Sequence, residues 1–123
     1  MVFNSGLLHV DSNQDGKILR QHWVGRVNDL RPAAALDGYI APVVERARSG
    51  GLTIEHHFEK LEYFNSAFIS WVIHQMQRAL ELKVKTVMYF EPKSHMHRSS
   101  FDALRVLQRD NPFIELVEAQ SAS

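Results

Sequence analysis

Residues 61–76, LEYFNSAFISWVIHQM, decide the fold that this sequence predicts. An apolar, aromatic run gives way to the polar pair Asn65-Ser66, and apolar residues then follow at helical spacing. Five of them would form one stripe along a helix: Ile69, Val72, Ile73, Met76 and Leu80. Asn and Ser are favoured N-cap residues, because their short side chains accept from the free amides of a first turn. The stretch therefore predicts a strand that ends where an amphipathic helix begins.

The hydroxyl of Ser66 is expected at the N-terminus of this helix, at the tip of the preceding strand. Free N–H groups and the helix dipole favour an added anion at such a position. We therefore predict that Ser66 is a regulatory phosphorylation site. The alternative is that Asn65 and Ser66 only cap the helix, as residues of these types commonly do.

Upstream, the pattern predicts a short edge strand at 7–10, a turn at 11–16, a strand at 17–27, a helix at 32–48 and a strand at 52–58. The turn, DSNQDG, is similar to the first half of a calcium-binding loop. The twelfth position of such a loop needs a bidentate Glu, and His22 stands there instead. A simple hairpin turn is favoured over a calcium site.

Downstream, the pattern predicts a helix at 66–82, a strand at 84–90, a loop at 91–98, a helix capped by Ser99 or Ser100, and a strand at 113–117. Residues 1–5 and 120–123 are expected to fray. Strands that alternate with helices imply right-handed crossovers and parallel pairing, and the opening hairpin adds an antiparallel edge. We therefore predict an α/β fold, one domain over residues 1–123, with a mixed, mostly parallel β-sheet and helices largely on one face.

Two histidine pairs raise the question of a metal site. His56 and His57 are adjacent in a strand, so they point to opposite faces and cannot easily share an ion. Packing or hydrogen bonding within the sheet is favoured for them. His95 and His97 form an H-x-H pair, but no carboxylate or third histidine lies close in the sequence. We predict no metal and no cofactor.

Charge and composition argue against several classes of protein. Fourteen Lys and Arg balance fourteen Asp and Glu, and a net charge of +0 argues against a nucleic-acid binder. The absence of cysteine excludes disulfides and cysteine-based zinc sites. No apolar run is long enough to cross a membrane, and the start of the chain lacks the layout of a signal peptide. A cytoplasmic protein is expected.

The layout resembles the STAS domain, the fold of bacterial anti-sigma-factor antagonists. Residues 23–27, WVGRV, look like the early strand of that family with its glycine, and residues 61–69 are similar to its signature turn. Residues 101–107 and 113–117 look like its last helix and strand. The string LEYFNS also resembles a STAS-like group of bacterial phosphoproteins that regulate diguanylate cyclases. The antagonists carry Asp before the serine, and Asn65 keeps the capping ability without the charge.

In both groups, a partner kinase phosphorylates a Ser or Thr at this turn and a partner phosphatase removes the phosphate. The resemblance therefore implies a non-enzymatic regulator in a partner-switching pathway. It would bind a kinase, an anti-sigma factor or a diguanylate cyclase under the control of phosphorylation at Ser66. Partner binding is expected at five residues of the turn, with the apolar ones exposed: Phe64, Asn65, Ser66, Ala67 and Phe68.

Two other classes of function stay open. One is a ligand-sensing or scaffold STAS-like domain that is never phosphorylated, which would also fit self-association into a homodimer. The other is a small enzyme, for which six acid–base candidates are present: His56, His57, His95, His97, Glu59 and Glu62. No known catalytic motif joins them, so no catalytic residue is predicted.

Overall fold

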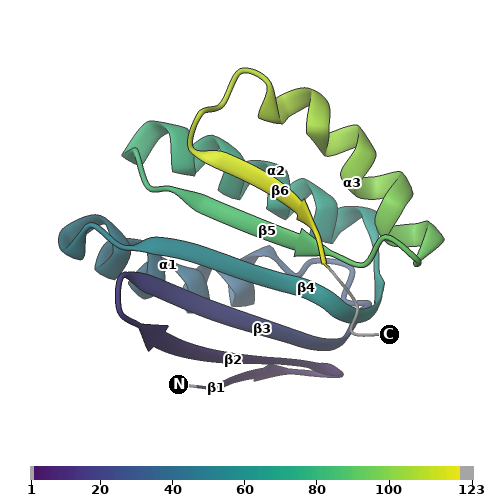
Figure 1. Cartoon of the computed structure of the whole chain (residues 1–123). Coiled ribbons are helices and arrows are strands. Elements are labelled where there is room, and N and C mark those ends of the chain that lie inside the picture. Colours follow the sequence, from purple (N-terminus) through teal and green to yellow (C-terminus); the bar gives the residue numbers. More distant parts are fainter. Residues whose placement is uncertain (1, 120–123) are drawn as a thin grey trace.

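The computed structural model describes residues 2–119, which form six strands and three helices (Figure 1). The elements are β1 Val2–Ser5, β2 Leu8–Asp15, β3 Ile18–Val27, α1 Ala33–Gly50, β4 Thr53–Phe64, α2 Ser66–Leu82, β5 Thr86–Phe90, α3 His95–Gln108 and β6 Ile114–Glu118. All six strands form one sheet in the order of the chain, β1-β2-β3-β4-β5-β6. The first two pairings are antiparallel and the other three are parallel. The predicted α/β class with a mixed, mostly parallel sheet is confirmed.

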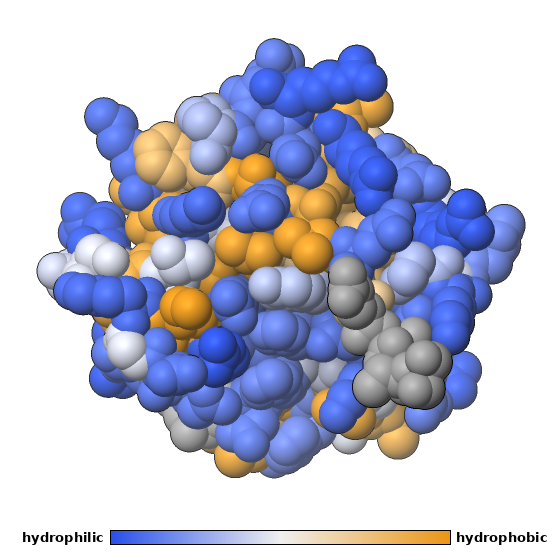
Figure 2. Space-filling model, viewed as in Figure 1, coloured by the Kyte–Doolittle hydropathy of each residue, from blue (hydrophilic) through white to orange (hydrophobic). Residues whose placement is uncertain are grey.

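The helices cover one face of the sheet and leave the other face bare (Figure 1). In β4, Ile54, His56 and Phe58 point under the helices and are buried, while the residues between them are only half-buried. Figure 2 shows the bare face, which is largely hydrophilic apart from an apolar area over β5 and β6. The prediction that the helices lie largely on one face is confirmed. Within residues 2–119, no helix combines the length and apolar character that a membrane crossing needs.

An aromatic cluster holds the helices against the sheet. Trp23 of β3 is fully buried, and its ring centroid lies 5.2 Å from Phe58, 5.7 Å from Phe68 and 5.6 Å from Trp71. Phe101 of α3 stacks on Phe90 of β5, with ring centroids 4.9 Å apart. Burial of each large side chain stabilises the fold by roughly 1.5–3 kcal/mol. The cluster therefore fixes α2 and α3 over the middle strands.

The N-terminal hairpins extend further than predicted. The fraying expected at residues 1–5 is wrong for Val2–Ser5, which form β1 and pair with β2. The ring of Phe3 stacks on Tyr39 of α1 at 4.9 Å, and this contact between distant residues holds the short strand in place. Strand β2 continues to Asp15, so the hairpin turn contains only Gly16 and Lys17.

Residues 11–15 do not form the loop of a calcium-binding motif. Asp11, Asn13 and Asp15 lie in an extended strand, so they cannot curl around one ion as a calcium loop does. No three potential metal-ligating side chains cluster anywhere in residues 2–119. A hairpin does join β2 to β3, but the turn predicted at 11–16 is wrong for residues 11–15, which belong to β2.

The last helix begins earlier than predicted. Its N-cap is Ser94, whose Oγ accepts from the amide of His97 at 3.3 Å, and not Ser99 or Ser100. Both Ser94 and Ser99 are plausible caps from sequence alone. The earlier start is stabilised by burial of His97, which lies in the first turn and is 1% exposed.

Candidate functional site

Helix α2 begins at Ser66, where the sequence predicts it, and Asn65 is its N-cap. The Oδ1 atom of Asn65 accepts from the amide of Phe68 at 3.0 Å. Its Nδ2 atom donates to the carbonyl of Asp29 at 2.7 Å. One side chain therefore closes the first turn of α2 and also ties it to the loop that follows β3.

Ser66 is exposed at the first position of α2. The amides of Ser66 and Ala67 have no acceptor within the helix, because no turn precedes them. The first turn carries no acidic residue. An anion on the Ser66 hydroxyl would therefore meet the positive end of the helix dipole and no like charge from that turn. The position can accept a phosphate at low electrostatic cost.

The exposure expected for Phe64 and Phe68 is wrong. Their side chains are 4% and 0% exposed, and their ring centroids lie 5.5 Å apart. Phe64 falls on the helix-covered face of β4, and Phe68 falls on the side of α2 that packs against Trp23. Asn65 and Ala67 are half-buried. Of the five predicted docking residues, only Ser66 is exposed.

Other apolar side chains are exposed at this end of the sheet. Leu30 is 86% exposed and follows Asp29, whose carbonyl Asn65 binds, and Tyr63 is 38% exposed near the end of β4. The guanidinium of Arg26 lies over the Tyr63 ring, 5.5 Å from its centroid. Because β3 and β4 are parallel, their carboxyl ends meet at one edge of the sheet. We call Arg26, Leu30, Tyr63 and Ser66 the turn surface.

A pocket of about 260 Å³ lies next to the turn surface. The β1–β2 turn, the end of β3 and the start of α1 form its walls, which include Arg26, Asp29 and Leu36. These residues come from three separate segments. No spacing within the sequence joins them, and sequence reasoning therefore missed them.

The buried histidines have structural roles. His56 is 2% exposed and its Nδ1 accepts from Trp23 Nε1 at 3.1 Å. Burial lowers the pKa of His56 to about 3, so its ring is neutral. His97 lies on α3 and not in a loop; its Nδ1 accepts from the Glu91 amide at 3.2 Å, and its Nε2 donates to the Leu61 carbonyl at 2.8 Å. With both ring nitrogens engaged, His97 cannot serve in the H-x-H metal pair.

The acid–base candidates do not converge at the turn. His56 and His57 lie on opposite faces of β4, as predicted. Glu62 is exposed and lies 3.9 Å from Arg26 in a weak ion pair. Only His57 and Glu59 contact each other, on the bare face of the sheet, with His57 Nδ1 3.0 Å from Glu59 Oε1.

Comparison with known proteins identifies the fold. No family model and no curated protein matches the sequence. By structure, the chain is similar to the anti-sigma factor antagonist SpoIIAA in its unphosphorylated form, with a TM-score of 0.58 and 15% identity over 91% of this chain and 89% of SpoIIAA. The chain has a STAS-like fold. The resemblance inferred from the turn at 61–69 is confirmed at the level of the fold.

A second STAS-like structure is similar over nearly the full length. It is an uncharacterised protein of the DUF3478 family from Shewanella loihica PV-4, described as having a SpoIIAA-like fold. Its TM-score is 0.56, at 13% identity over 97% of this chain and 92% of that one. At such identities the comparison shows the fold alone. Function must therefore be argued from the turn at Ser66.

Replacement of Asn65 by alanine is expected to reduce the free energy of unfolding by about 2 kcal/mol. The change removes an N-cap, which is worth about 1 kcal/mol, and a second hydrogen bond to the Asp29 carbonyl, which adds a similar amount. Urea unfolding followed by circular dichroism measures it. The neighbouring Ser66→Ala variant is the control and should stay within about 0.5 kcal/mol of the wild type. If the two variants lose the same free energy of unfolding, the hydrogen bonds of Asn65 do not stabilise the start of α2 as described.

Proposed function

We propose that this protein is a non-enzymatic bacterial regulator of the partner-switching type, controlled by reversible phosphorylation of Ser66. The observation that carries the proposal is the exposed Ser66 hydroxyl at the capped N-terminus of α2, within a STAS-like fold. A partner kinase and phosphatase would set the state of Ser66. An anti-sigma factor or a diguanylate cyclase would bind the turn surface.

The proposed mechanism is a change of charge without a change of fold. Phosphorylation adds roughly −1.5 to −2 charges at pH 7, together with a large demand for hydration. The N-terminus of α2 tolerates the anion, so the helix stays formed. A partner that covers Leu30 and Tyr63 would have to dehydrate the nearby phosphate, which is unfavourable. Phosphorylation therefore releases such a partner.

Mass spectrometry of the protein isolated from its native cells, with phosphatases inhibited, tests the modification. We expect a phosphate on the peptide that contains Ser66. Pull-downs should then recover a partner with the unmodified protein and lose it with Ser66→Asp. Ser70→Ala is the matched control, because Ser70 is exposed one turn further along the same helix, and it should switch like the wild type.

The Ser66→Ala protein decides the proposal. It should bind its partner to the same extent before and after treatment with the kinase. A Ser66→Ala protein that still exchanges partners under kinase and phosphatase treatment contradicts the proposed function.

A ligand-sensing function is the second candidate, and the pocket beside the turn surface favours it. Its volume of about 260 Å³ lies below the roughly 300–1,000 Å³ typical of small-molecule sites. We therefore rank it second. If Ser66 is never modified in cells, ligand sensing becomes the favoured function, and Asn65 and Ser66 act only as a helix cap.

A further inference from the structure

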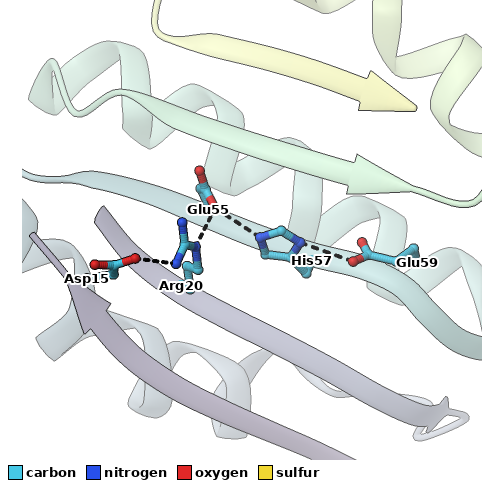
Figure 3. A network of polar contacts seen from close by, with 5 residues as sticks. All are labelled: Asp15, Arg20, Glu55, His57 and Glu59. Atoms are coloured by element: carbon cyan, nitrogen blue, oxygen red, sulfur yellow. Dashed lines mark hydrogen bonds and ion pairs between the residues drawn. The ribbon is translucent and has the colours of Figure 1, made fainter. Parts of the chain in front are cut away.

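The bare face of the sheet carries a charged network that has no part in the phosphorylation mechanism proposed for Ser66 (Figure 3). His57 lies between two carboxylates of its own strand: its Nε2 is 2.9 Å from Glu55 Oε1, and its Nδ1 is 3.0 Å from Glu59 Oε1. Residues at i, i+2 and i+4 of a strand share one face, so the three side chains form a row. Arg20 of β3 extends this row, because it lies 3.2 Å from Glu55 and 2.7 Å from Asp15.

The number of donors required fixes the protonation state of His57. An ionised carboxylate only accepts hydrogen bonds, and a neutral imidazole has a single N–H. Only the imidazolium form donates to Glu55 and Glu59 at the same time. The described geometry is therefore that of a charged His57. Loss of its proton would break one of the two bonds.

A second histidine stacks on this ring. His22 of β3 is the register partner of His57, with ring centroids 4.9 Å apart and 22° between the planes. Tyr89 of β5 stacks on His57 at 4.4 Å and 5°. A proton on His22 would place two positive rings in contact. The arrangement therefore favours a state in which only one of the two rings is charged.

The electrostatics of the pair agree with this geometry. The hydrogen bond to Glu59 raises the pKa of His57, against the opposing effect of burial. Burial and then the charge of His57 lower the pKa of His22. Burial is the largest single effect on Glu59 and opposes its ionisation. The hydrogen bond from His57, a backbone hydrogen bond and the charges of the two histidines together outweigh burial, so the pKa of Glu59 is lowered.

We propose that His22 and His57 form a proton switch that sets the charge of the bare sheet face. At acidic pH both rings are charged, at intermediate pH only His57 is charged, and at higher pH neither is. Deprotonation of His57 makes the face more negative by one charge and removes one of its two hydrogen bonds. Glu55 also accepts from Arg20 Nε at 3.2 Å, whereas His57 is the side-chain donor that the described residues supply to Glu59. Glu59 Oε2 is already buried without a partner among the described residues, so Glu59 has little to replace the lost bond.

Charged groups on neighbouring strands also act on the pair. The charge of Asp11 raises the pKa of His22, and that of Lys60 lowers it. Arg20 and Glu115 act on Tyr89, which stacks on His57, and Asp15 pairs with Arg20. Because the folded pKa of His57 is raised, its contribution to stability is fully present below the unfolded value of about 6.5. It is lost as the pH rises through the folded value. The inference does not depend on phosphorylation of Ser66.

Long-range ¹H–¹⁵N spectra of the ¹⁵N-labelled full chain, recorded across a pH series, test the switch. The His57→Gln variant identifies the signals of the His57 ring. In the wild type we expect both ring nitrogens of His57 to be protonated at a pH where His22 is neutral, with a midpoint for His57 above about 6.5. In His57→Gln, the midpoint of His22 should rise, because the neighbouring positive charge is gone.

Matched carboxylate variants identify the source of the shift. Glu59→Gln is expected to lower the midpoint of His57 by about one unit, because it removes an anionic acceptor. Glu45→Gln is the control, because Glu45 lies exposed on α1, on the other side of the sheet, where it pairs with Arg48. A wild-type midpoint for His57 at or below that of a histidine in an unstructured peptide overturns the proposal. A midpoint that Glu59→Gln leaves unchanged overturns it as well.

Discussion

Acidification from pH 7 to pH 4 is expected to lower the free energy of unfolding by about 3 kcal/mol through His56 alone. The ring is buried, and its pKa is lowered to about 3, whereas in the unfolded chain the value is about 6.5. Between these values the unfolded chain binds one more proton than the folded protein. Stability therefore falls as the pH falls through this window. The loss is a large fraction of the roughly 5–15 kcal/mol that holds a typical domain together.

Urea unfolding at a series of pH values, on the wild type and on His56→Gln, isolates the contribution of His56. Glutamine does not titrate and retains an oxygen that can accept from Trp23 Nε1. The variant should therefore lose much less stability than the wild type between pH 7 and pH 4. His74→Gln, at an exposed position of α2, controls for the loss of any histidine. If the free energy of unfolding falls with pH equally in the wild type and in His56→Gln, the buried neutral ring of His56 is not the cause of the acid destabilisation.

Replacement of Gly25 by alanine is expected to destabilise the protein by about 3–5 kcal/mol. Gly25 has a backbone φ angle of 105°, which residues that carry a side chain rarely adopt. A Cβ atom would lie 2.1 Å from the carbonyl oxygen of Leu7, which is backbone and accepts from the Arg26 amide at 3.2 Å. The clash can be relieved only by moving the β1–β2 turn away from β3.

Gly16→Ala separates the clash from the backbone conformation. Gly16 also has a positive φ, of 60°, but no atom lies within 4 Å of where its Cβ would be. This variant should cost only about 1–2 kcal/mol. Urea unfolding of both variants measures the difference. Equal losses would mean that the close approach of Leu7 to Gly25 has no energetic importance.

Features that depend on residues close together in the sequence were predictable. The start of α2 at Ser66 follows from the cap at Asn65 and from an apolar stripe at strict helical spacing. The split of His56 and His57 between two faces follows from the alternation of a strand. The short strand β1 was not predictable, because its order comes from pairing with β2 and from the contact of Phe3 with Tyr39, far along the chain.

The candidate site was predictable in position but not in its surroundings. Whether an aromatic residue beside a helix cap is exposed depends on the packing of the whole domain, and Phe64 and Phe68 proved to be buried. Leu30 reaches the site because Asn65 binds a carbonyl 36 residues earlier in the chain. The network around His57 did leave a signal, the alternation of Glu55, His57 and Glu59 along one strand. That spacing predicts a shared face, but not the stacking on His22 and Tyr89.

The strand order of the sheet has a consequence for how the chain folds. Because spatial order equals chain order, each strand pairs only with its neighbours in sequence. The longer connections that must close are residues 28–52, 65–85 and 91–113, which are similar in length and carry one helix each. The entropic cost of closing such loops grows only slowly with length, and the absence of very distant pairings favours fast folding. During synthesis, each new strand can join the growing edge as it leaves the ribosome, and no earlier pair has to open to admit it.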